Sequence, residues 1–231
     1  MKKVFASGLI IYLFFSFGHL VAQDCGVYFS SQKGMKIEMV SYDKKDKATA
    51  IIKYELIDVK PVADGTALTF SNETYDTKGK LLAKGESTGK CVGSDYYTDI
   101  RNLNSEMIPK SADIKMSVTG EQLIYPANLA VGDQLKDASL NVKSGFEGGL
   151  TIMNLTANIV DRKVEGFETV ETPAGKFDCV KITYTMNMKF MGNRTIKGVE
   201  YLAKGIGVVK TEQFDDKDKK VSSLLVTKIE K

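Results

Sequence analysis

The sequence predicts an all-β protein: one large, curled antiparallel sheet, built as a half-open barrel or a closed meander barrel, with at most one or two short helical turns. Two observations predict it. Short runs rich in Val, Ile, Thr, Tyr and Phe alternate with polar residues, which is typical of strands with one buried face. Polar turns separate these runs, and no stretch has a convincing helical period. A sheet with this many strands is expected to curl.

The clearest alternation lies in the expected strand Phe177–Phe190. One of its faces carries lysine, threonine and asparagine. The other face is apolar and consists of Ile182, Tyr184, Met186, Met188 and Phe190. Thr172-Pro173-Ala174-Gly175 is expected to turn the chain into this strand, because proline and glycine fix the backbone angles of turns.

The remaining elements follow the same reasoning. A helical turn or two could form at Arg101–Ile108, before Pro109. The expected strands, besides Phe177–Phe190, are Met35–Tyr42, Ala48–Val59, Thr66–Tyr75, Leu81–Cys91, Asp95–Ile100, Ile114–Thr119, Leu123–Tyr125, Ser139–Val142, Leu150–Val160, Val164–Glu171, Ile196–Leu202, Val208–Phe214 and Val221–Ile229.

Three turns share one pattern: an aromatic residue, Asp, any residue, Lys, Gly or Asp, and Lys. They are Tyr42–Lys47, Tyr75–Lys80 and Phe214–Lys219. We expect hairpin tips in which the first Asp accepts from backbone amides and the later Gly or Asp takes the left-handed conformation. The clustered acids could suggest calcium, but lysines interleave every copy and the twelve-residue spacing of a calcium loop is missing.

The first residues resemble a secretory signal. Lys2 and Lys3 precede an apolar run, and cleavage after Gln23 is expected, leaving a single β domain at 24–231. A retained membrane anchor is the alternative. Asp24 disfavours lipid attachment at Cys25, since a small residue is expected there. No later run is long enough to cross a bilayer, so the chain is expected to be exported, to the periplasm or beyond the cell.

Cysteine pairing is expected in an oxidising compartment. The three cysteines, Cys25, Cys91 and Cys179, allow three single bridges. We favour Cys25–Cys91, because it would tie down the N-terminal segment. Cys179 would then be a buried thiol.

Composition disfavours several kinds of function. The single histidine, His19, lies in the expected signal, so histidine-based catalytic triads and zinc sites are excluded from the mature chain. Loss of Lys2 and Lys3 lowers the formal charge from +3 to +1, and no basic face for nucleic acid is visible. We therefore predict no enzymatic activity, no cofactor, no metal and no nucleic-acid partner.

A group of methionines is the most suggestive side-chain cluster. Met186, Met188 and Met191, together with Met153, could offer thioethers to cuprous copper. Met186 and Met188 also share their face with Tyr184 and Phe190, which is typical of a core or of a cavity wall. We take Tyr184, Met186, Met188 and Phe190 as candidate ligand-lining residues.

Two segments resemble a known family. Thr172–Cys179 (TPAGKFDC) and Tyr201–Glu212 (YLAKGIGVVKTE) are similar to the TapB-like family of exported bacterial proteins, a domain of unknown function. The resemblance covers the whole expected mature chain, although Glu200-Tyr201 stands where a Trp-Tyr pair is commoner. It implies a curled antiparallel sheet similar to the half-open barrels of periplasmic lipoprotein carriers, and it brings no catalytic residue.

The function that this sequence favours is non-enzymatic binding of a lipid or another hydrophobic ligand, or of a lipoprotein, on a concave apolar face. The alternative is an interaction scaffold of the cell envelope with a solid core and no ligand. The oligomeric state is not predicted.

Overall fold

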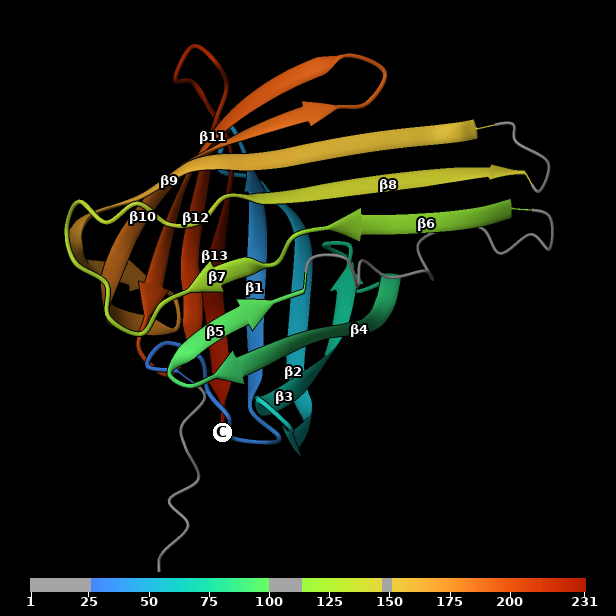
Figure 1. Cartoon of the computed structure of the whole chain (residues 1–231). Coiled ribbons are helices and arrows are strands. Elements are labelled where there is room, and N and C mark those ends of the chain that lie inside the picture. The colour runs from blue at the N-terminus through green and yellow to red at the C-terminus, as the bar shows by residue number, and fades with distance from the viewer. Residues whose placement is uncertain (1–25, 100–113, 147–150) are drawn as a thin grey trace, which may run out of the picture.

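A computed structural model describes residues 26–99, 114–146 and 151–231, with side chains at 114–116 excepted. In these residues all the regular structure is β, in one antiparallel sheet of 13 strands (Figure 1). The strands are β1 (Lys36–Asp43), β2 (Ala48–Val62), β3 (Gly65–Tyr75), β4 (Leu81–Val92), β5 (Asp95–Thr98), β6 (Ile114–Gly120), β7 (Leu123–Tyr125), β8 (Ala138–Phe146), β9 (Thr151–Thr172), β10 (Gly175–Lys189), β11 (Asn193–Ala203), β12 (Gly207–Phe214) and β13 (Lys220–Glu230).

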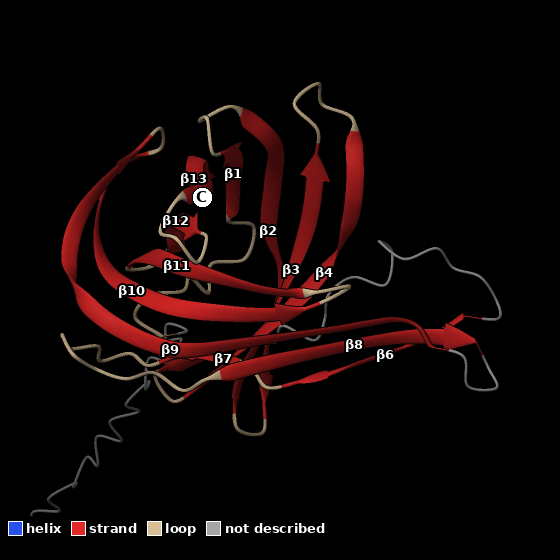
Figure 2. Ribbon diagram, turned by 90° about the horizontal axis from the view of Figure 1, so that it is seen from above, coloured by secondary structure: helices blue, strands red, loops and turns tan. Residues whose placement is uncertain are grey.

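Strand order confirms the all-β prediction and decides between its two forms. Most neighbours in the sheet are also neighbours in the chain, but β13 pairs with β1, so the first and last strands lie side by side. The sheet begins with β6 and ends with β7, and these two edge strands follow each other in the chain, separated by Glu121 and Gln122. The sheet curls strongly around its concave face without closing (Figure 2). It is therefore a half-open barrel.

One expected break in the chain does not occur. The predicted strands Leu150–Val160 and Val164–Glu171 are a single strand, β9. The register with β10 shifts where Thr183 pairs with Lys163 but Thr185 pairs with Val160. Asp161 takes a φ of 54° at this shift. A β-bulge of this kind adds a residue and bends the strand without ending it. Because the added residue interrupts the alternation of apolar and polar side chains, the sequence pattern predicts two strands instead of one.

The three repeated turns are confirmed as hairpin tips. Asp43 Oδ1 accepts from the amides of Lys45 and Lys47 at 2.8 and 3.0 Å. Asp76 and Asp215 make the same pair of bonds. The later residue of each tip has positive φ: 57° at Asp46, 83° at Gly79 and 59° at Asp218. These amides hold the pKa values of Asp43 and Asp215 below the ordinary value.

Every second side chain of the strands supplies the core, as predicted. Leu56, Leu68, Val164, Ile182 and Leu202 are almost fully buried in one cluster on the concave side. A second cluster includes Val209 and Val226, and it also holds Cys179, whose thiol is free and buried as expected. The predicted helical turn at 101–108 and Cys25 lie outside the described residues.

Candidate functional site

The concave face is filled at one end and open at the other. Cross-strand pairing places Ile182, Glu200, Thr211 and Leu224 on this one face, because directly opposed residues of paired strands point the same way. At the filled end the space beside Met35, Tyr54 and Leu56 amounts to only about 30 Å³, and its wall is almost wholly apolar. A volume of that size admits about one water molecule.

The open end holds a cleft of about 310 Å³. Its lining comes from the centre of the sheet, β1, β2, β12 and β13, and consists of Ser41, Ile52, Thr211, Gln213, Ser222, Ser223 and Leu224. Two of these side chains are apolar and the others are neutral hydrogen-bonding groups. Such a wall suits an uncharged or amphipathic ligand better than an ion.

Of the four predicted lining residues, Tyr184 lies next to this cleft through its contact with Gln213, but it is not part of the lining. Its ring lies over Gly198, where an added Cβ would come within 2.1 Å of the ring carbon Cζ. The side chain of Gln213 hydrogen-bonds the Tyr184 hydroxyl, and burial raises the pKa of Tyr184 to about 12. Ser222 Oγ donates to Gln213 Oε1 at 2.9 Å. Tyr184, Gln213 and Ser222 therefore form a hydrogen-bonded row, of which Gln213 and Ser222 line the cleft.

The other three predicted residues diverge from it. Met186 is half-buried. Met188 packs against a separate small cluster of Leu140, Val142 and Ala157. Phe190 follows the end of β10 in a hairpin turn and is 45% exposed. The apolar side of β10 thus lies beside the cleft and does not line it.

Sequence reasoning missed Gln213 and Ser222. Both lie in expected strands close to the repeated hairpin tip Phe214–Lys219: Gln213 directly precedes it and Ser222 follows it by three positions. Their alternation with apolar neighbours places them on a face, but only the pairing Gln213↔Ser222 makes them neighbours.

A buried polar cluster was also missed. Arg162, 1% exposed, donates from Nη1 to the carbonyl oxygens of Ile124 and Lys136 at 3.1 and 3.0 Å. Its Nη2 lies 3.8 Å from Glu200 Oε1. Tyr125 donates to Glu200 Oε2 at 3.2 Å, and the Arg162 guanidinium lies 5.0 Å from the Tyr125 ring centroid. The bulge at Asp161 is what turns Arg162 inward.

The pKa shifts and contacts of this cluster indicate a structural role. Burial raises the pKa of Glu200, and Arg162 and Tyr125 oppose that rise. Burial, reinforced by Glu200, also raises the pKa of Tyr125 well above its ordinary value. Arg162 joins β9 to the edge strand β7 and to the segment before β8, so it holds the two ends of the curled sheet toward each other.

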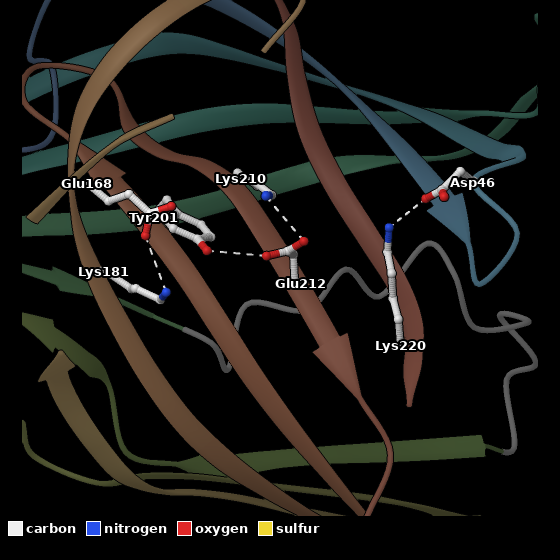
Figure 3. A network of polar contacts seen from close by, with 7 residues as sticks. All are labelled: Asp46, Glu168, Lys181, Tyr201, Lys210, Glu212 and Lys220. Atoms are coloured by element: carbon white, nitrogen blue, oxygen red, sulfur yellow. Dashed lines mark hydrogen bonds and ion pairs between the residues drawn. The ribbon is translucent and has the colours of Figure 1, made fainter. Parts of the chain in front are cut away.

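The opposite, convex face carries exposed and half-exposed ion pairs (Figure 3). Lys181 lies 3.3 Å from Glu168, and Lys210 lies 3.2 Å from Glu212. Tyr201 donates to Glu212 at 3.3 Å. These are pairs of opposite charge spread along neighbouring strands, with no convergence on one point.

Neither metal nor membrane-spanning features are found in the described part. Residues 26–99, 114–146 and 151–231 contain no group of three or more histidine, cysteine or acidic side chains suited to a metal ion. The same ranges contain no helix long and apolar enough to cross a membrane. Burial, with Asp178 and Glu168 nearby, raises the pKa of Cys179 to about 11, which makes its thiol a poor nucleophile.

Comparisons with known proteins agree on the fold. A family model described as DUF3108-like matches residues 32–226. A solved Bacteroides fragilis protein, inferred to be exported and described as having a YmcC-like fold, is 24% identical with a TM-score of 0.72. A Parabacteroides distasonis protein inferred to be a lipoprotein is 21% identical with a TM-score of 0.73. Each covers 90% of this chain and 100% of its own. No curated protein matches the chain.

Proposed function

The chain belongs to the DUF3108-like family, and we propose that it is an exported, non-enzymatic protein that binds a lipid or another amphipathic ligand in the cleft of its concave face. The narrower TapB-like assignment stays a prediction.

The cleft is the observation that carries this proposal. Its volume of about 310 Å³ falls at the lower end of the range typical of small-molecule sites. Ile52 and Leu224 offer apolar contact, while Ser41, Gln213 and Ser222 offer hydrogen bonds. A short acyl chain with a neutral polar head would match both the apolar and the hydrogen-bonding side chains of this wall.

Export is supported by the N-terminal sequence and by the neighbours. Lys2, Lys3 and the apolar run that follows are typical of a secretory signal. The two solved proteins of the same fold are inferred to be an exported protein and a lipoprotein.

A non-enzymatic role is supported by the chemistry of the described residues. Glu200, a buried carboxylate of the concave face, is engaged by Arg162 and Tyr125. Cys179 is held as a neutral thiol. A general base or a nucleophile needs an accessible group with a pKa near the working pH.

Ligand uptake tests the proposal. Ser222→Trp should fill the cleft and weaken binding of a fluorescent fatty acid by tenfold or more. Val221→Trp is the matched control, because Val221 is exposed and does not line the cleft. Native mass spectrometry of the protein from a bacterial host would show any retained lipid. Absence of both retained lipid and fatty-acid uptake would refute the proposal.

An interaction scaffold is the second candidate. The filled end of the concave face, with its residual space of about 30 Å³, favours it. On this alternative Ser222→Trp changes stability alone, and the chain binds no fatty acid.

A further inference from the structure

We infer that one end of the molecule docks on an anionic membrane surface, through exposed apolar side chains at two neighbouring strand ends. This surface, the apolar tip, consists of Phe146 at the end of β8, Ile152 at the start of β9, and Phe190 and Met191 in the β10–β11 turn. The adjoining ends of β8 and β9 and the β10–β11 turn project from the same side of the sheet (Figures 1 and 2). The inference does not depend on the concave cleft.

Exposure is the first observation. Met191 is 96% exposed, Ile152 52%, Phe146 46% and Phe190 45%. Met191 also has a φ of 50°, a conformation that costs a residue with a Cβ free energy. Neither burial nor backbone preference therefore accounts for a methionine at this position. Grouped exposed apolar side chains mark interaction sites.

The charged side chains around the apolar tip indicate which kind of partner it binds. Lys143, Lys189 and Arg194 are exposed beside the apolar tip. Across the described parts of Ala138–Val160 and Thr185–Ile196 there is no acid, and the sequence adds only Glu147 in the undescribed turn. None of the three bases forms an ion pair with any residue that the structure describes.

Several lysines elsewhere on the surface have an acidic partner. Lys36 lies 3.8 Å from Glu55, Lys163 lies 3.1 Å from Glu165, and Lys181 lies 3.3 Å from Glu168. The combination that distinguishes the apolar tip is one of unpaired bases and exposed apolar side chains on described strand ends that carry no acid, whereas Lys78, beside the exposed Leu82, shares its turn with Asp76. This combination fits the interface of an anionic bilayer, where apolar groups enter the acyl boundary and bases meet the phosphates.

Vesicle sedimentation of the mature chain tests this inference. We expect binding to vesicles that contain phosphatidylglycerol, weaker binding to phosphatidylcholine alone, and loss of binding on raising the salt. Phe190→Ser with Met191→Ser, and separately Lys189→Glu with Arg194→Glu, should each weaken binding by about tenfold or more. Both pairs lie in or beside an exposed turn, and circular dichroism would check folding.

A matched control lies at another hairpin. Leu82→Ser with Lys78→Glu removes an exposed apolar side chain and reverses a base near the β3–β4 turn, and it should leave vesicle binding unchanged. Ser222→Trp should also leave it unchanged, which separates this inference from the ligand cleft. Equal binding by wild type and both tip variants, or no binding to anionic vesicles, would overturn the inference.

Discussion

At the scale of single residues, two glutamates that accept from tyrosine hydroxyls lie in opposite environments. Tyr125 donates to the buried Glu200 at 3.2 Å, and Tyr75 donates to the half-exposed Glu73 at 2.5 Å. Burial raises the pKa of Glu200. Lys84 and then Tyr75 lower the pKa of Glu73. The same hydrogen bond thus accompanies opposite shifts, because burial dominates at one site and a lysine at the other.

The two glutamates should therefore affect stability with opposite dependence on pH. A raised carboxyl pKa means that the folded state binds the proton more tightly, so the contribution of Glu200 to the free energy of unfolding falls as pH rises above the ordinary glutamate value. The contribution of Glu73 is fully present above the ordinary glutamate pKa and is lost as pH falls from that value through the lowered pKa of the folded state. Urea unfolding of Glu200→Gln and Glu73→Gln, each compared with wild type across acidic to neutral pH, measures this. Differences that change in the same direction would contradict it.

At the scale of elements, the hairpin tips are set by local chemistry. One aspartate oxygen accepts two amides in each repeated tip, and the residue three positions later takes a left-handed conformation. Glycine at Gly79 and aspartate at Asp46 and Asp218 occupy this position. Both residue types tolerate it, because glycine has no Cβ and aspartate is among the residues most often found there.

Substitution at Gly79 should show the cost of that conformation. A Cβ at Gly79 would touch nothing within 4 Å, so Gly79→Ala should lower the free energy of unfolding by about 1 kcal/mol through backbone strain alone. Gly79→Asp should cost less, as the two sister tips indicate. The control is Gly166→Ala, where an added Cβ also meets nothing but φ is not left-handed, and the expected change is within about 0.5 kcal/mol. Chemical denaturation measures all three, and an equal cost at Gly79 and Gly166 would refute the explanation.

At the scale of the whole molecule, contacts between distant segments hold the edge strand β7 and the N-terminal segment to the rest of the curled sheet. Arg162 joins β9 to the edge strand β7 through the Ile124 carbonyl. The N-terminal segment has a second tie: Gly26 lies against the β4–β5 turn, where an added Cβ would come within 3.1 Å of the Ser94 carbonyl oxygen. Cys91, near the end of β4, pairs with Tyr96 across that turn. The residue after Cys25 is therefore placed close to Cys91, which supports the predicted bridge.

Bridge formation has a direct test. Alkylation of the unreduced, unfolded mature chain should label one thiol, Cys179, and reduction should expose the other two. Cys91→Ser should lower the free energy of unfolding by about 2–4 kcal/mol, because the open chain gains entropy when unfolded. Cys179→Ala should leave the stabilising effect of the bridge intact. Labelling of all three cysteines without reduction would exclude the pairing.

The sequence by itself determined the class of the fold, the hairpin tips and the side chains that face inward. The alternation of apolar and polar residues and the residues of a turn are local features. The buried face of a strand can therefore be predicted from that strand alone. Only the tertiary structure decided that β13 pairs with β1, that two expected strands form one bulged strand, and that Gln213 and Ser222 line a cleft beside Tyr184. Those facts, and the meeting of Arg162 with Glu200, depend on which strands lie opposite each other. Alternation says which way a side chain points but not what it meets across the sheet.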